Sequence, residues 1–258
     1  MSQELLDRSN AEFWDTLCGS NFAQSVGITG REPEDLRRFD AAYLSRYPYL
    51  ARYVPHDLTG KEVLEVGLGY GTLGQLLAER GADYHAADIA PGPVAMMRKR
   101  LEWLGRPREN VRQASVLALP WEDETFDYVY TIGCLHHTGD LRRSVDEVHR
   151  VLRPGGRAVV MLYNRRSLRH VVLSLRNRWR GMSRAESDAA LRSLYDGGET
   201  PHTDFVSKQD ARALFDAFSR VKIDLQNFDG FRFGFRREWF LGNIARVAGL
   251  DLYITADK

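Results

Sequence analysis

The sequence has few cysteines, no long apolar run and almost no net charge. Cys18 and Cys134 are its two cysteines in 258 residues, too few for a four-cysteine metal site or a disulfide framework, and they suit a reducing compartment. The first residues, MSQELLDRSNAEFW, lack the basic and apolar regions of a signal peptide. No segment approaches the roughly 20 apolar residues that span a bilayer. A net charge of +1 gives no overall attraction to nucleic acid or anionic membranes. We therefore expect a cytoplasmic protein of one domain.

The hydrophobic pattern changes near residue 60. Before it, amphipathic segments at 2–17 and 31–47 predict helices, the second with Pro33 in its first turn. After it, short β-branched runs alternate with helical segments, which predicts an α/β fold with a mostly parallel sheet. Strands are expected at 62–66, 83–88, 111–115, 126–132, 156–163, 220–227 and 250–255. Helices are expected between them at 73–81, 93–105, 141–152, 207–218 and 237–249.

Four segments make up the expected single domain. Residues 1–59 form a helical cap, 60–163 a cofactor-binding core, 164–206 a helical lid insert, and 207–258 a helix and strands that complete the sheet. The basic and glycine-rich RPGG, 153–156, is expected to end the helix before it.

The segment VLEVGLGYGTLG, 63–74, fits two kinds of cofactor loop. Gly69, Gly71 and Gly74 have the spacing of a dinucleotide-binding loop, in which backbone amides approach a pyrophosphate. Glu65, however, stands two residues before Gly67, where its charge would repel a pyrophosphate and suit a cationic ligand. Asp88, at the end of the second expected strand, can accept hydrogen bonds from the ribose of either cofactor. Glu65 therefore favours S-adenosylmethionine over NAD(P).

Several further motifs resemble the class I S-adenosylmethionine-dependent methyltransferases, in particular the small-molecule "type 11" branch. They are VLEVGLGYG, AADIAP, VLALPWEDETFDYVYTIGCLHH and EVHRVLRPGGRAVVMLY. The resemblance implies a Rossmann-like, seven-stranded sheet whose last strand is antiparallel. It also implies binding residues for S-adenosylmethionine, which are Glu65, Gly67, Gly69, Gly71, Asp88, Ile89, Ser115, Val116 and Gly133. Ser115 stands where the family often has an acid for the adenine amino group, so adenine recognition is expected to depend on the backbone of Val116.

The acceptor is expected beyond the carboxyl ends of the fourth and fifth strands. His136, His137 and His202 are candidate general bases, with Asp204 orienting His202. Tyr163 and Asn164 are expected to hydrogen-bond the acceptor. Aromatic residues of the cap and insert are expected to close an apolar pocket, and they are Phe13, Trp14, Tyr43, Tyr47 and Trp179. Cys134 is expected to be a small residue behind the cofactor, and no metal site is predicted.

The predicted function is methyl transfer from S-adenosylmethionine to the O, N or C atom of a small molecule, in the biosynthesis of specialised metabolites. An NAD(P)-dependent oxidoreductase and a non-catalytic cofactor-binding protein are the alternatives. A nucleic-acid substrate is not expected, and a homodimer is left open. Residues 165–180 hold six arginines and no acid, which fits a solvated helix face or a site for phosphate, a carboxylated substrate, a carrier protein or a membrane surface.

Overall fold

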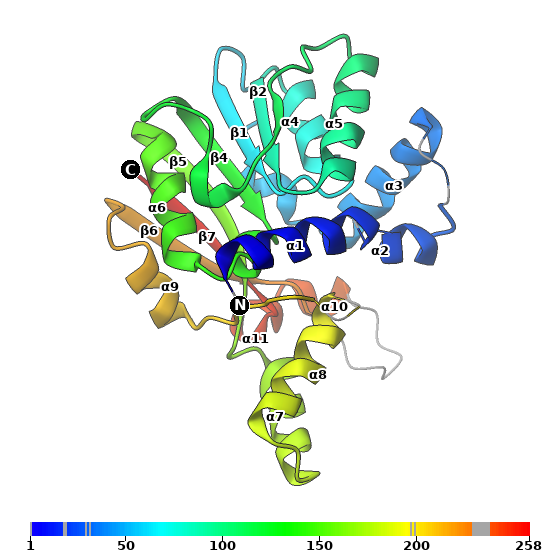
Figure 1. Ribbon diagram of the computed structural model, residues 1–258, viewed down its shortest axis with the longest axis vertical. Helices are drawn as coiled ribbons and strands as arrows, with labels where there is room; N and C mark the ends of the chain where they lie inside the picture. The colour runs from blue at the N-terminus through cyan, green and yellow to red at the C-terminus, as the bar shows by residue number, and fades with distance from the viewer. Residues whose placement is uncertain are drawn as a thin grey trace.

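The protein folds around one central sheet (Figure 1). The computed structural model describes residues 2–17, 20–28, 30, 32–196, 198, 200–228 and 238–258. Cys18 lies outside the described residues. The sheet has seven strands in the order β3-β2-β1-β4-β5-β7-β6. The strands are β1 (Glu62–Val66), β2 (Asp83–Asp88), β3 (Val111–Gln113), β4 (Phe126–Ile132), β5 (Leu152–Tyr163), β6 (Arg220–Gln226) and β7 (Asp251–Asp257).

Strand β7 is antiparallel to both of its neighbours, while β1 to β5 pair in parallel. This is the seven-stranded, mostly parallel sheet with an antiparallel last strand that the sequence predicts. Because β1, β2 and β4 are parallel neighbours, their carboxyl ends and the loops that follow them meet along one edge of the sheet.

Helices cover both faces of the sheet, and each face has its own apolar core. Val145 and Val148 of α6 (Leu141–Val151) and Phe215 belong to one cluster. Leu77 of α4 (Thr72–Glu79) and Met97 of α5 (Pro91–Trp103) belong to the other. Strands buried on both sides explain the nearly continuous apolar runs in β1 and β5.

Two groups of helices lie outside this core. Helices α1 (Gln3–Leu17), α2 (Ser20–Ser25) and α3 (Pro33–Arg46) precede the sheet, and α1 passes beside the β4 end and α5 (Figure 1). Helices α7 (Leu168–Trp179) and α8 (Arg184–Asp196) pair as a hairpin that projects away from the sheet. The remaining helices are α9 (Lys208–Leu214), α10 (Glu238–Leu241) and α11 (Ala245–Ala248).

The segment after α6 differs from the expectation. Helix α6 ends at Val151 and β5 starts at once with Leu152, so RPGG forms the first part of a strand instead of a glycine cap. Gly155 does adopt a positive φ of 78°, but it does so within this extended segment. No helix in the described part of the chain is long and apolar enough to cross a bilayer.

Candidate functional site: two joined cavities at the carboxyl ends of the strands

Glu65 is a buried carboxylate at the end of β1. Its side chain accepts a hydrogen bond from the hydroxyl of Tyr84, 2.5 Å away on the neighbouring strand β2. Burial raises the pKa of Glu65 to about 8, although the Tyr84 hydrogen bond opposes that shift. The residue is 2% exposed and lines the larger of the two cavities described below. A buried acid of this kind is ready to be paired with a cation.

The glycines of the loop serve different purposes. Gly67 (φ +83°) lies so close to Cys134 that a Cβ would stand 2.5 Å from the Cys134 Cβ. Gly74 leaves room for Tyr84 and Glu65, since a Cβ there would be 2.6 Å from the Glu65 Oε2. Gly69 (φ +51°) faces open space. Gly71 is the left-handed N-cap residue that precedes α4. Only Gly69 therefore leaves free space for a ligand, while Gly67 and Gly74 permit close packing.

Asp88 ends β2 beside this loop. Its Oδ2 accepts the backbone N–H of Leu68 at 2.7 Å, and its Oδ1 accepts that of Ala90 at 2.9 Å. Burial raises the pKa of Asp88 to about 6 despite these hydrogen bonds. Each carboxylate oxygen has a second lone pair, so Asp88 can still accept two hydroxyl groups.

The smaller cavity, of about 170 Å³, lies beside Asp88. The predicted cofactor residues Gly67, Gly69, Asp88, Ile89, Ser115, Val116 and Gly133 all line it, and Glu65 and Gly71 do not. The Ser115 hydroxyl accepts the backbone N–H of Leu117 at 3.3 Å and so caps a short turn. Cys134 also lines this cavity, and burial raises its thiol pKa to about 12, which makes it a poor nucleophile and fits the predicted packing role.

Helix α1 covers the smaller cavity. Asn10 and Trp14 lie on its lining, and the side-chain amide of Asn10 donates a hydrogen bond to the carbonyl of His137 at 2.8 Å. At the other end of α1, the Asp15 carboxylate accepts the backbone N–H of Gly92 at the start of α5. The helix is thus tied to the segments that follow β4 and β2.

The larger cavity, of about 500 Å³, adjoins the smaller one. Both are lined by Trp14, Gly67, Gly69, Ile132 and Gly133. Aromatic side chains dominate the rest of its wall, and they are Phe22, Phe39, Tyr43, Tyr47, Tyr70, Tyr163, Tyr195 and Tyr253. Trp14, Tyr43 and Tyr47 are therefore where the sequence places them. Trp179 is not, because it lies at the end of α7 and is 92% exposed.

Sequence reasoning missed two acids of this cavity, Asp196 and Asp251. The hydroxyl of Tyr163 donates to Asp196 Oδ1 at 2.9 Å, and that of Thr203 donates to Oδ2 at 2.8 Å. Asp196 ends α8 and Tyr163 ends β5, so only the return of the insert onto the sheet brings them together. No local sequence signal marks such a pair.

With this geometry in view, the comparisons with known proteins identify the core. Residues 64–160 match a family described as "Methyltransferase domain". The chain contains a class I S-adenosylmethionine-dependent methyltransferase domain. The family match spans the strands and loops from β1 to β5 that build the cofactor side of the two cavities.

Named relatives share this part of the chain. A malonyl-[acyl-carrier protein] O-methyltransferase of Halorhodospira halophila is 33% identical over 50% of this chain and 43% of its own length. A demethylmenaquinone methyltransferase of Clavibacter sepedonicus is 36% identical over 40% of this chain and 41% of its own. The chain thus spans less than half the length of these curated relatives.

A solved structure shares the methyltransferase fold over most of the chain. It is a possible histamine N-methyltransferase of Thermotoga maritima, with a TM-score of 0.57 at 18% identity, covering 84% of this chain and 89% of that one. A likeness at this identity supports the fold of the domain, and the residues themselves must indicate the chemistry.

The residues of the domain fit S-adenosylmethionine. Glu65 is a buried acid whose carboxylate accepts a hydrogen bond from the neutral hydroxyl of Tyr84, which leaves room for the ligand's ammonium group to pair with it. Asp88 suits the ribose, and Ile89 and Val116 offer apolar contact for the adenine. Gly69 leaves the loop open toward both cavities.

The three candidate histidines occupy different environments. His136 is fully buried and lines neither cavity, and burial lowers its pKa well below the usual value. His137 lines the smaller cavity, packs against the ring of Trp14, and also has a pKa lowered by burial. His202 pairs with Asp204, with 3.1 Å between Nε2 and Oδ2, as the sequence suggests, but neither residue lines a cavity.

Asn164 also lies apart from the cavities. Its side-chain amide donates to the carbonyl of Gly249 at 2.8 Å, and its Oδ1 accepts the backbone N–H of Arg166 at 2.9 Å. The first bond joins the end of β5 to the segment just before β7, and the second holds the turn after β5. The structure therefore gives Asn164 a local structural role in place of the predicted contact with the acceptor.

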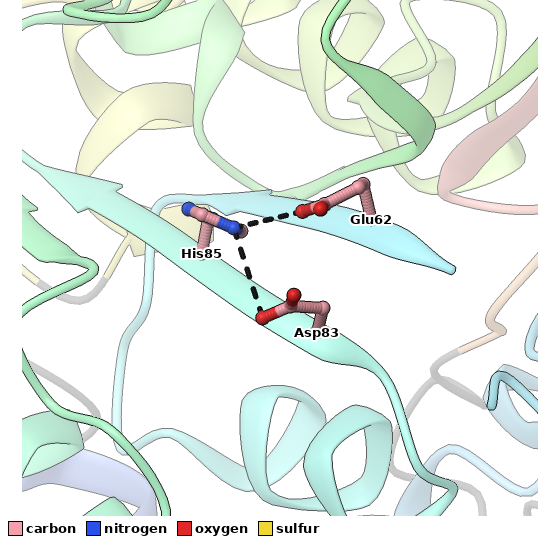
Figure 2. Close-up of side chains that lie close together, drawn as sticks. All are labelled: Glu62, Asp83 and His85. Carbon is pink, nitrogen blue, oxygen red and sulfur yellow. Dashed lines mark hydrogen bonds and ion pairs between the residues drawn. The ribbon is translucent and has the colours of Figure 1, made fainter. Parts of the chain in front are cut away.

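A small group of possible metal ligands lies away from the candidate site (Figure 2). His85 Nε2 is 2.9 Å from Glu62 Oε2 and 4.0 Å from Asp83 Oδ1. Glu62 and Asp83 begin β1 and β2, so the group sits toward the amino ends of the strands, whereas both cavities lie at the carboxyl ends. Strand pairing alone brings Glu62 beside the other two, which explains why the sequence did not reveal it. The prediction of a metal-independent reaction stays a prediction.

Proposed function

We propose that this protein transfers a methyl group from S-adenosylmethionine to a small-molecule acceptor held in the larger cavity. The observation that supports this is the junction of the two cavities at Gly67, Gly69 and Gly133. Residues suited to the nucleoside line one cavity, and Glu65, suited to the ammonium, lines the other. Bound S-adenosylmethionine supplies a methyl group on a good leaving group. Holding an acceptor in line is then worth roughly 7–11 kcal/mol of the barrier.

Residues 1–59 and 164–206 act as covers in this proposal. Helix α1 contributes to the smaller cavity, and the α7–α8 hairpin contributes Arg169, Leu194, Tyr195 and Asp196 to the larger one. Some relatives are named for methylation in quinone biosynthesis and for malonyl-[acyl-carrier protein]. These names favour an acceptor that is a small molecule or a small group attached to a carrier. The acceptor atom is O, N or C, and we place the reaction in the biosynthesis of specialised metabolites in the cytoplasm.

Tyr163 is our choice for the residue that orients the acceptor. Its hydroxyl proton is directed to Asp196, so its oxygen is left to accept a hydrogen bond from an acceptor O–H or N–H. Burial and the nearby Asp196 raise the pKa of Tyr163 well above its usual value, so it acts as a neutral hydrogen-bonding group. Of the histidines, His137 remains the candidate base, since it alone lines a cavity.

Calorimetric titration tests the cofactor part of the proposal. We expect saturable binding of S-adenosylhomocysteine and none of NAD(H) or NADP(H). A panel of phenols, amines and carboxylic acids then tests methyl transfer by following release of S-adenosylhomocysteine. Tyr163→Phe should lower kcat/KM by roughly 2- to 13-fold, as expected for loss of a neutral hydrogen bond of about 0.5–1.5 kcal/mol. Tyr128→Phe, on β4 but outside both cavities, is the matched control. Binding of a nicotinamide cofactor alone would overturn the proposal.

A further inference from the structure

Helix α7 has a buried inner face. His170, Leu173 and Asn177 are its buried residues, and the Asn177 side-chain amide donates to the hydroxyl of Ser187 on α8 at 3.2 Å. The spacing of three and four residues places these side chains on one side of the helix. The contacts of α7 with α8 thus use one side only, and the opposite side faces outward on the projecting hairpin (Figure 1).

The outer face of α7 is apolar. Leu175 is 62% exposed and Trp179 is 92% exposed, and the exposed Leu168, Val171 and Val172 lie near them. At about 100° per residue, these side chains fall within an arc of about 100° centred opposite the buried face. An apolar stripe usually faces the core of its own protein, but this one faces away from it. A contiguous exposed apolar stripe of this kind indicates an interaction surface.

Arginines flank the apolar stripe. Residues 165–180 contain six of them and no acidic residue. Helical geometry places Arg176 on one side of the stripe and Arg178 on the other, with Arg180 just beyond the helix. Within the part of the chain that the structure describes, no carboxylate lies within 4.0 Å of these three guanidinium groups. An apolar stripe bordered by cations is the pattern of helices that lie in the interface of an anionic bilayer.

The same hairpin forms part of the acceptor cavity. Arg169 of α7 and Leu194 and Tyr195 of α8 line the larger cavity, and the Arg169 guanidinium lies 5.0 Å from the ring centre of Tyr195. Arg169 lies in the first turn of α7, beside Leu168 and Val172 of the apolar stripe, while Trp179 lies roughly 15 Å farther along the helix axis. A surface bound to α7 would lie close to the place where the acceptor binds.

We propose that the outer face of α7 binds the surface of an anionic lipid bilayer and that the acceptor is a lipid-soluble molecule taken up from that surface. The second half of this statement rests on the proposed methyl transfer. A second copy of the chain suits the face less well, because a symmetric contact would place two arginine-rich faces against each other. The apolar stripe enters the interface, and the arginines reach the headgroups beside it.

Vesicle sedimentation of the full chain tests the docking surface. We expect binding to vesicles of phosphatidylglycerol and phosphatidylcholine, weakening with salt, and little binding to phosphatidylcholine alone. Replacing both Leu175 and Trp179 with serine should weaken binding at least 10-fold. Replacing Arg176 and Arg178 with glutamine should weaken it roughly 25-fold, at about fivefold for each arginine. Val247→Ser, at an apolar residue of α11 that is 80% exposed, should bind as the wild type does.

Binding of S-adenosylhomocysteine separates this inference from the proposed function. All variants should keep wild-type affinity for it, which also shows that they are folded. If the wild type binds S-adenosylhomocysteine but not anionic vesicles, the docking proposal is wrong and the proposed function stands. Wild-type vesicle binding by the Leu175 and Trp179 variant would also overturn it. So would a wild-type dimer that this variant converts to a monomer, because a second copy would then cover the face.

The uptake of the acceptor has its own measurement. With a lipid-soluble acceptor identified in the panel, anionic vesicles should raise the rate of methyl transfer for the wild type at least several-fold. The variant lacking Leu175 and Trp179 should lose this gain while keeping its rate on water-soluble acceptors. An equal gain in both proteins would show that the acceptor does not enter from a surface bound by α7.

Discussion

Replacing Glu65 with glutamine removes an ionisable carboxyl group from the cavity and keeps the shape of the side chain. In the free protein the pKa of Glu65 is about 8, so about 0.9 of the molecules carry a proton on this group at pH 7. A ligand ammonium beside it favours the charged carboxylate. Binding of S-adenosylhomocysteine should therefore release close to one proton at pH 7. Its affinity should rise with pH, by up to about tenfold per unit below pH 8.

The variant should bind more weakly and release almost no proton. Loss of a charge-assisted hydrogen bond costs about 1.5–3 kcal/mol, which is roughly a 10- to 150-fold loss of affinity. Calorimetry at pH 7 in phosphate and in Tris measures proton release, because the two buffers differ in ionisation enthalpy. Glu62→Gln, on the same strand but outside both cavities, should behave as the wild type. Equal affinity and equal proton release in wild type and Glu65→Gln would refute the assignment of the ammonium site.

Two further predictions concern stability. Gly67→Ala should lower the free energy of unfolding by about 1–3 kcal/mol more than Gly60→Ala, as measured by urea unfolding. Both glycines have a positive φ, but only at Gly67 would a Cβ collide with Cys134. Equal losses of stability in the two variants would contradict this. Burial lowers the pKa of His136, so the folded state resists its protonation and stability is lost as pH falls below about 6.5. His136→Gln should reduce the loss of stability between pH 7 and 5 by up to about 1.4 kcal/mol per unit, and an unchanged pH dependence would show that His136 titrates normally.

The central sheet was predictable because its strands are specified by local patterns. The apolar runs of β1, β4 and β5 are nearly continuous because helices cover both faces of the sheet, and such runs need no tertiary information to recognise. The positions of Glu65 and Asp88 were also predictable. Each lies at the carboxyl end of a strand, and the carboxyl ends of parallel strands meet at one edge of the sheet. Their raised pKa values did not follow, because these depend on how completely the neighbouring helices exclude water.

The sequence by itself determined the fold class, the glycine loop and the acids that face it, because these lie within short, regularly spaced segments. Only the tertiary structure decided which insert residues reach the cavity. Asp196 meets Tyr163 across 33 positions, while Trp179, which looked like part of a lid, points into solvent. The physical reason is that the apolar stripe of α7 lies on its exposed side, while two of the three residues on its buried side are polar. Its pattern alone does not say which side meets the protein, and the polar contact of Asn177 with α8 decides it.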